Sequence, residues 1–270
     1  MAHWRPVYAV LEREVVRMFR QRTRLVSAMV RPLIWLFVIG AGFGAVLQQA
    51  GGLSYQQFLV PGVLGMTMLF GAMLAALTMV YDKESGVMRM LIIAPFPHYW
   101  IVVAKMLAAA LAALLQALLL VVLLAVLGYL DWQMRFGLLA LALVATSAAC
   151  AGIGMLVAAF TRTLDNFAAI MNFVIFPVFF LSGSLYPVSR LPGALKAVAL
   201  INPYTYGVDL LKHAVLGVLS SGMGADFAAS TDLAVLAGFT VAALLVASWR
   251  FSRESAYEPM IRILTGKRGG

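Results

Sequence analysis

Residues 106–130 read MLAAALAALLQALLLVVLLAVLGYL, an uninterrupted apolar run between Lys105 and Asp131. About 20 mainly apolar residues are enough for a helix to cross the hydrocarbon core of a bilayer, so this run is long enough to span a membrane. The whole composition agrees, because 63% of the 270 residues are hydrophobic and only 11% are charged, against about 25% charged residues in an ordinary soluble domain. The sequence excludes a water-soluble fold and predicts an all-α integral membrane protein.

Five further charge-free runs have a similar length. They cover residues 32–53, 58–81, 136–160, 167–186 and 233–249. We therefore expect six transmembrane helices in a single domain, in which residues 32–250 hold the spans and residues 251–270 form a cytoplasmic tail.

The region between the fifth and sixth runs is apolar but interrupted. Its charge-free pieces are no longer than about a dozen residues, too short to span a bilayer, because Arg190, Lys196, Asp209, Lys212 and Asp226 divide it. Prolines and glycines break it further. The pattern predicts a re-entrant helical segment, two short helices that enter one leaflet and return.

Residues 1–31 combine apolar and basic positions. The apolar residues recur at near-helical spacing, with arginines on most remaining positions. They are Trp4, Tyr8, Leu11, Val15, Phe19 and Leu25. This pattern predicts an amphipathic amino-terminal helix on the inner face of the membrane.

The distribution of Lys and Arg predicts the orientation. Six spans put both termini on one side, and 16 of the 20 Lys and Arg residues then lie on that side. Because short loops rich in Lys and Arg stay in the cytoplasm, both termini are expected there. The net charge of +9 is thus mainly a topology signal and not a sign of nucleic-acid binding.

Several kinds of chemistry lack support in the sequence. The six runs contain no ionisable residue, which disfavours an ion-driven secondary transporter. His3, His98 and His213 are far apart and belong to no HExxH pattern, and Cys150 is the only cysteine. No GxSxG or GxxxxGK[ST] pattern occurs. We expect no catalytic, metal or nucleotide site and no cofactor bound by this chain.

Two stretches carry a family resemblance. Residues 176–192 read FPVFFLSGSLYPVSRLP, and Asn202-Pro203 and Asp209 follow. This order of Ser-Gly, Pro, Leu-Pro, Asn-Pro and an acidic residue resembles the signature of type-2 ABC exporter permeases. Residues 81–91, YDKESGVMRML, resemble the family's loop after span two, although Val87 and Arg89 replace its usual hydroxyl and carboxylate residues.

The resemblance implies a function. It implies the transmembrane subunit of an ABC exporter in the bacterial plasma membrane, paired with a second permease copy as a homodimer and with separate ATPase subunits. ATP and Mg²⁺ would bind to the partner ATPase, and this chain would not itself be an enzyme. A transporter with neither a phosphate loop nor intramembrane charge needs energy from a partner, so the residues are compatible. The expected substrate is a drug, a lipid or a lipid-linked glycan.

The loop after span two is the implied ATPase-docking segment. Its candidate residues are Asp82, Glu84, Gly86, Arg89, Leu91 and Pro95. A short cytoplasmic helix ending at Pro95, with Met88, Met90 and Leu91 on its apolar side, suits a groove on a partner. The alternative is that these apolar residues rest in the membrane interface.

Two other sets of residues are singled out. Thr67, Thr78 and Asn172 are candidates for lining the translocation path, since by analogy spans two and five line it. A second set would form an exit gate or serve structural roles: Ser182, Gly183, Pro187, Asn202, Pro203 and Asp209. We favour the structural roles, because Asn-Pro breaks a helix and Asp209 can cap a helix or face the outer water.

Two rival functions stay open at this stage. One is a stand-alone secondary transporter, which would depend on an ion gradient. The other is a membrane scaffold subunit that transports nothing. Stimulation of a partner ATPase by substrate would separate the exporter from both.

Overall fold

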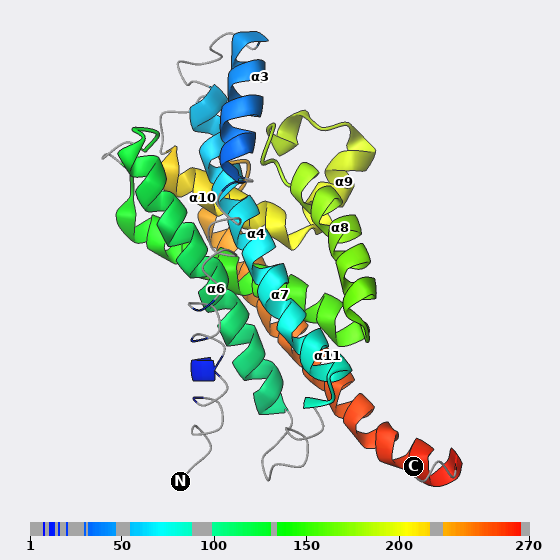
Figure 1. Ribbon diagram of the computed structural model, residues 1–270. Coiled ribbons are helices and arrows are strands. Elements are labelled where there is room, and N and C mark those ends of the chain that lie inside the picture. The colour runs from blue at the N-terminus through cyan, green and yellow to red at the C-terminus, as the bar shows by residue number, and fades with distance from the viewer. Residues whose placement is uncertain are drawn as a thin grey trace.

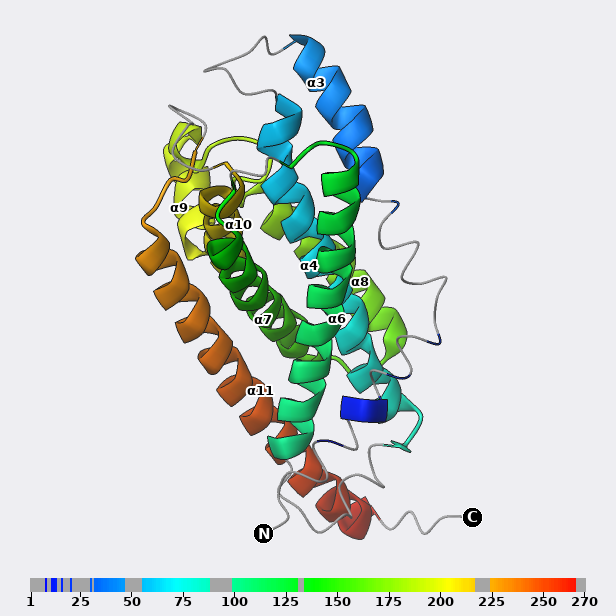
Figure 2. The same ribbon diagram turned by 90° about the vertical axis from the view of Figure 1, so that its left-hand side faces the viewer.

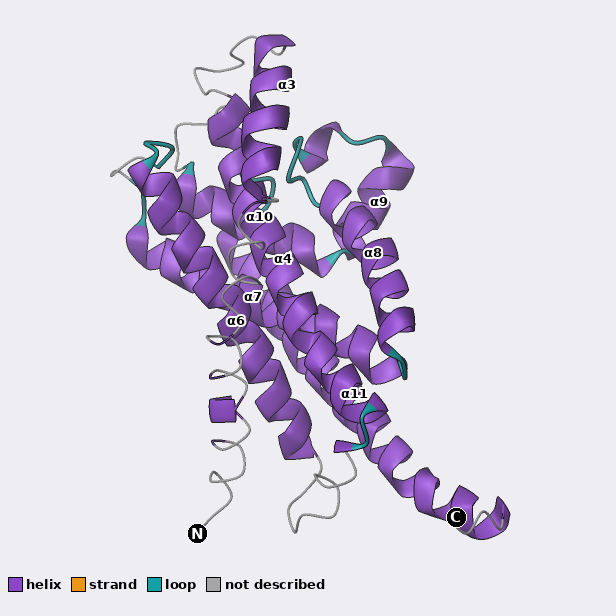
Figure 3. Ribbon diagram, viewed as in Figure 1, coloured by secondary structure: helices purple, strands orange, loops and turns teal. Residues whose placement is uncertain are grey.

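The computed structural model describes residues 8, 11–13, 16, 20, 30, 32–46, 55–87, 99–130, 134–216 and 224–265. Within these ranges every regular element is a helix (Figure 3), which confirms the all-α fold. Four helices are long and apolar enough to cross a membrane. They are α4 (Tyr55–Glu84), α6 (Tyr99–Val126), α7 (Phe136–Phe160) and the Ala229–Arg253 part of α11 (Ala229–Thr265). They correspond to predicted spans two, three, four and six.

The other two predicted spans contain shorter helices. In the first, Pro32–Gly44 is apolar and includes a π-helical turn, η1 (Trp35–Ile39), that continues into α3 (Gly40–Val46). In the fifth, α8 (Leu164–Phe180) has 17 residues. At about 1.5 Å per residue such a helix is about 26 Å long, shorter than a hydrocarbon core of about 30 Å. The count of six spans stays a prediction.

Helix α4 is the central element of the bundle. In α4, 78% of the most apolar stretch is buried inside the structure, against 17% of the corresponding stretch in α11. Helices α6, α7 and α8 pack around it, as does a short helix, α10 (Pro203–Val215) (Figures 1 and 2). Small residues permit this close packing. A Cβ atom on Gly62 would lie 2.6 Å from the carbonyl oxygen of Ser184, and one on Gly71 would overlap the Gln116 side chain of α6.

Three short helices connect α8 to α11. They are η2 (Val188–Arg190), α9 (Gly193–Ile201) and α10. Two short α-helices were expected in this region, and their relation to a leaflet stays a prediction. Both lie toward the end of the bundle where α11 begins, and α11 ends at the opposite end (Figures 1 and 2). We call the first end the outer end and the second the cytoplasmic end, following the orientation predicted from the sequence.

The two terminal segments are only partly described. Most of residues 1–31, and with it the predicted amphipathic helix, lies outside the described residues. Helix α11 continues past Arg253 to Thr265, so the described part of the predicted tail is helical.

Candidate functional site

The cytoplasmic end of α4 carries a buried ion cluster around Asp82. Its carboxylate lies 2.5 Å from Nζ of Lys105 in α6 and 2.9 Å from Nη2 of Arg13. Asp82 is 2% exposed. Lys105 also donates to the Thr78 hydroxyl. A buried carboxylate is tolerable only when it is paired, so these contacts hold the ends of α4 and α6 together.

The next two residues bind the ends of α7 and α8. Nζ of Lys83 donates to the carbonyl oxygens of Ala158 and Ala159, at 3.0 and 3.2 Å. Oε2 of Glu84 accepts a 2.9 Å hydrogen bond from the backbone N–H of Leu164, the first residue of α8. Helix ends leave such backbone groups unpaired and favour a cation at the carboxyl end and an anion at the amino end. The last turn of α4 is thus connected to three neighbouring helices.

Gly86 lies just after the end of α4. Its φ of +77° is a left-handed conformation that glycine adopts without a steric penalty, and it follows the last residue of α4 by two positions. Arg89, Leu91 and Pro95 lie outside the described residues. Asp82 and Glu84 both bind groups of their own chain. For all six residues, contact with an ATPase stays a prediction.

The structure does not bring the three candidate path residues together. Thr67 is wholly buried in α4, and its hydroxyl donates to the carbonyl of Val63. Thr78 is half-buried near Lys105 and bonds to the carbonyl of Ala75. Asn172 is exposed on α8. A role of these residues in a path stays a prediction.

The Ser-Gly turn after α8 is densely bonded. The Ser182 hydroxyl donates to the carbonyl of Phe179, and Oγ of Ser182 lies 2.6 Å from Oγ of Ser184. Gly183 has a φ of +78°, and a Cβ atom there would lie 2.7 Å from Val188. Pro187 is buried and precedes η2. These contacts support a structural role for the turn, and the exit gate stays a prediction.

Asn202 and Pro203 start α10. Oδ1 of Asn202 accepts a hydrogen bond from the backbone N–H of Tyr204, and Pro203 occupies the first turn, where a missing N–H costs nothing. Nδ2 of Asn202 donates to the carbonyl of Val178 in α8 at 2.8 Å. One side chain therefore caps α10 and attaches it to α8.

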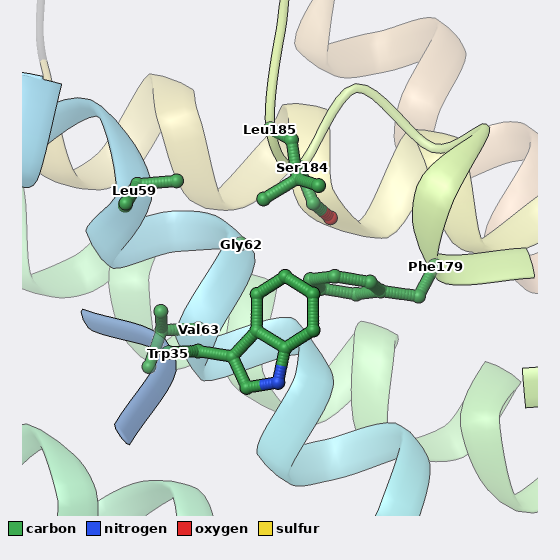
Figure 4. Close-up of a pocket in the computed structure, with 7 residues that line it drawn as sticks. All are labelled: Trp35, Leu59, Gly62, Val63, Phe179, Ser184 and Leu185. Carbon is green, nitrogen blue, oxygen red and sulfur yellow. The ribbon is translucent and has the colours of Figure 1, made fainter. Parts of the chain in front are cut away.

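A small apolar pocket lies between η1, α4 and the turn at residues 182–185 (Figure 4). The indole of Trp35 and the ring of Phe179 meet edge to face, 5.5 Å apart, on one side. Leu59, Gly62, Val63, Ser184 and Leu185 complete the lining. The space is too narrow for a water molecule.

A second polar cluster lies at the outer end. The carboxylate of Asp209 in α10 accepts hydrogen bonds from the backbone N–H groups of Asp226 and Phe227, at 2.7 and 2.9 Å. Nζ of Lys212 lies 3.6 Å from Oδ2 of Asp226 and 4.0 Å from Oδ1 of Asp209. Asp226 also accepts hydrogen bonds from Val188 and Ser189 at η2. The cluster fixes α10 to the residues before α11.

Burial shifts the pKa values of two side chains in α10, a helix that is not one of the four candidate membrane spans. It raises the pKa of the Asp209 carboxyl, although the two N–H donors and the Lys212 ammonium oppose that shift. Burial also lowers the pKa of Lys212, and the Asp209 and Asp226 carboxylates oppose it.

Sequence reasoning missed the partners in both clusters. Lys105, Lys212 and Asp226 only delimit apolar runs in the sequence, and Lys83 contributes only to the count that predicts orientation. The sequence does hold a signal for one ion pair. The acidic residue Asp82 directly follows the run at 58–81, and the basic residue Lys105 directly precedes the next run, at 106–130. The helices extend beyond the charge-free runs and carry these charges inside the bundle.

A family model described as ABC-2 type transporter matches residues 5–216, which includes every element from η1 to α10. The chain belongs to the ABC-2 type transporter family. This finding confirms the resemblance inferred from the Ser-Gly turn, Asn202-Pro203 and Asp209.

Named proteins that are similar to this ABC-2 family chain include two nodulation proteins and a transport permease. Nodulation protein J of Rhizobium leguminosarum bv. trifolii is 30% identical over 196 residues, covering 72% of this chain and 74% of that protein. Nodulation protein J of Sinorhizobium fredii is 25% identical over 91% of this chain and 92% of its own length. The inner membrane transport permease YadH of Escherichia coli is 24% identical over 90% of this chain and 93% of its own length.

Proposed function

We propose that this chain is the permease subunit of an ABC exporter in a bacterial inner membrane, powered by separate ATP-binding subunits. The observation that carries the proposal is the family match over residues 5–216. The four long apolar helices support a multi-pass membrane protein, and one relative is named an inner membrane transport permease. Both termini would lie in the cytoplasm.

The contacts around Asp82 suit a mechanical transmission. Residues 85–98 follow α4 directly and would dock on the ATPase. Force applied there reaches α6 through Lys105, α7 through Lys83 and α8 through Glu84. Closure of two ATPases around ATP would then move the end of α4 and its neighbours as one unit, which is how rigid-body switches transmit small local changes.

The exposed face of α8 is the best candidate for meeting a second permease copy along the path. Asn172 is exposed there beside Phe173, which is 80% exposed, and Phe176. A face that combines amide side chains with phenyl rings suits an amphiphile more than an ion, which supports a drug, a lipid or a lipid-linked glycan as the substrate.

A gentle purification tests the proposal directly. The tagged chain is extracted from its native membrane in mild detergent, and the proteins that co-purify are identified with their mass ratios. We expect an ATPase with a Walker phosphate loop at a one-to-one ratio, and ATP hydrolysis by the complex that an amphiphilic substrate stimulates.

The control is the same tag on an unrelated inner membrane protein, which should not recover the ATPase. If the chain emerges alone from several detergents and no preparation hydrolyses ATP, the ABC exporter assignment fails. Transport that follows an ion gradient would then identify a secondary transporter.

A further inference from the structure

Three potential metal-binding groups meet at the outer end, where α10 packs against the first turn of α11. Nε2 of His213 lies 4.0 Å from Oδ2 of Asp209 and 3.8 Å from Oδ2 of Asp232. One ligand atom from each residue lies within 4.8 Å of both others. The histidine that appears isolated in the sequence is thus placed between two carboxylates from different helices.

Asp232 shows that this arrangement is incomplete. The residue is 0% exposed, and neither of its carboxylate oxygens accepts a hydrogen bond. A buried carboxylate without a hydrogen bond is costly unless a bound proton or a positive group beside it neutralises its charge. Nε2 of His213 approaches Oδ2 of Asp232 to 3.8 Å.

The local charges leave that requirement unmet. Asp209, Asp226 and Asp232 bring three carboxylates together, and Lys212 supplies one ammonium, placed 3.6 Å from Asp226 and 4.0 Å from Asp209. The two N–H groups that bind Asp209 use one lone pair on each of its oxygens and leave others free. A divalent cation would balance the remaining charge.

We propose that Asp209, His213 and Asp232 bind a divalent transition-metal ion, with Zn²⁺ the best match. Zn²⁺ accepts imidazole nitrogen and carboxylate oxygen at about 2.0–2.2 Å in tetrahedral sites, so its ligand atoms lie about 3.3–3.6 Å apart. The distances of 3.8 and 4.0 Å exceed this spacing by less than 1 Å, and the ligand atoms of Asp209 and Asp232 lie within 4.8 Å of each other. The mixed nitrogen and oxygen set disfavours Ca²⁺ and Mg²⁺, which prefer oxygen.

Binding at Nε2 leaves the ring proton of His213 on Nδ1. In the structure Nε2 donates to the carbonyl oxygen of Phe227 at 2.8 Å, so metal binding requires this N–H to be lost and the ring to turn from that carbonyl toward the two carboxylates. The ion would connect α10 to α11 at the outer end, where the two helices otherwise meet through side-chain packing.

Zinc binding by the purified full-length chain tests the proposal. The chain is prepared without a polyhistidine tag, stripped with EDTA and titrated with ZnCl₂, and bound metal is measured by mass spectrometry after gel filtration. Unfolding is followed by tryptophan fluorescence. We expect one Zn²⁺ per chain and a saturable rise in Tm that EDTA reverses.

Two variants and one control locate the site. Asp232→Asn, which preserves shape, and His213→Gln should each weaken Zn²⁺ binding by more than about 100-fold, since the loss of even an outer-shell partner costs about 10- to 100-fold. Asp165→Asn removes an exposed carboxylate at the start of α8 and should bind Zn²⁺ like the parent chain.

Three results would overturn the proposal. They are a Tm that changes with neither ZnCl₂ nor EDTA, less than one tightly bound Zn²⁺ per chain, or undiminished Zn²⁺ binding in both variants. If Asp232→Asn does not fold, His213→Gln and the visible absorption of bound Co²⁺ decide the question alone. Loss of Zn²⁺ binding in folded His213→Gln supports the site, and retained Zn²⁺ binding in that variant refutes it.

Discussion

Asp82 shows how a single side chain organises the cytoplasmic end of this permease. Its carboxylate is buried between Lys105 and Arg13, at 2.5 and 2.9 Å, and it belongs to a helix that is itself surrounded by other helices. In this environment the energetic role of the pair is asymmetric. Removing Lys105 leaves the buried Asp82 carboxylate with Arg13, whose side chain is 42% exposed, whereas removing both Lys105 and Asp82 leaves neither buried charge.

Lys105→Met should therefore destabilise the chain strongly. We expect a loss of at most about 3–5 kcal/mol in the free energy of unfolding, because Arg13 still pairs with Asp82, and a double variant with Asp82→Asn should recover much of it. Denaturation of the purified chain in detergent, followed by tryptophan fluorescence, measures both. Lys196→Met, on the exposed surface of α9, is the matched control. A double variant as unstable as Lys105→Met would contradict this account.

The residue scale is also where the sequence was least informative. The charged residues that end the apolar runs located four long helices, but they did not indicate which charges would pair. Asp209 and His213 share a helix face at a spacing of four residues, but Asp232 lies 19 positions after His213 and joins them only because α11 folds back along α10. Tertiary contacts of this kind are not encoded in local spacing, so the sequence indicated no metal site.

At the scale of elements, close contact between helices depends on glycines in α4. A Cβ atom on Gly62 would lie 2.6 Å from the backbone oxygen and 2.9 Å from Cβ of Ser184. The turn that holds Ser184 is fixed by the Ser182 hydroxyl bonds and by a hydrogen bond from the Tyr55 hydroxyl to the carbonyl of Leu185. The turn therefore has little freedom to move away from a Cβ atom added at Gly62.

Gly62→Ala should displace this turn and cost about 1–3 kcal/mol of stability, the range typical of an overpacked core. Gly238→Ala is the matched control, because a Cβ atom there meets nothing within 4 Å. It should be neutral or gain about 0.5–1 kcal/mol, since alanine favours a helix. Thermal unfolding in detergent compares the two, and equal Tm values would show that the turn adapts.

Helix existence was predictable and helix length was not. Charge-free runs located α4, α6, α7 and α11 because the bilayer demands long apolar segments. The same rule overestimated the fifth run, residues 167–186, since the turn at Ser182 and Gly183 ends α8 while the sequence stays apolar. Hydrophobicity reports solubility in lipid and does not report where the backbone turns.

At the scale of the whole molecule, the orientation is open to direct measurement. Ser189 is exposed in η2 at the outer end and Ser85 is exposed after α4 at the cytoplasmic end. In a background with Cys150→Ala, an impermeant maleimide should label Ser189→Cys in intact cells and Ser85→Cys only after permeabilisation. The opposite pattern would invert the topology inferred from Lys and Arg.

The proposed coupling to an ATPase gives a second test at the scale of the whole assembly. Leu91→Asp should remove a docking anchor worth about 2 kcal/mol or more, and Glu84→Arg should break the bond to α8 and repel its N-terminus. In both, we expect ATP hydrolysis by the reconstituted complex without export of substrate. Glu84→Gln keeps the acceptor oxygen and is the control. Full export in both test variants would refute the docking segment.

The central position of α4 has a consequence for how the protein is made. Ribosomal synthesis delivers α4 before α6, α7 and α10, the helices that later cover it. Until they arrive, its glycine-lined surface meets lipid, which packs poorly against a helix shaped for close protein contact. Assembly of this chain therefore finishes only after α10 has been translated, and a nascent chain that stalls earlier presents an unfinished helix to membrane quality control.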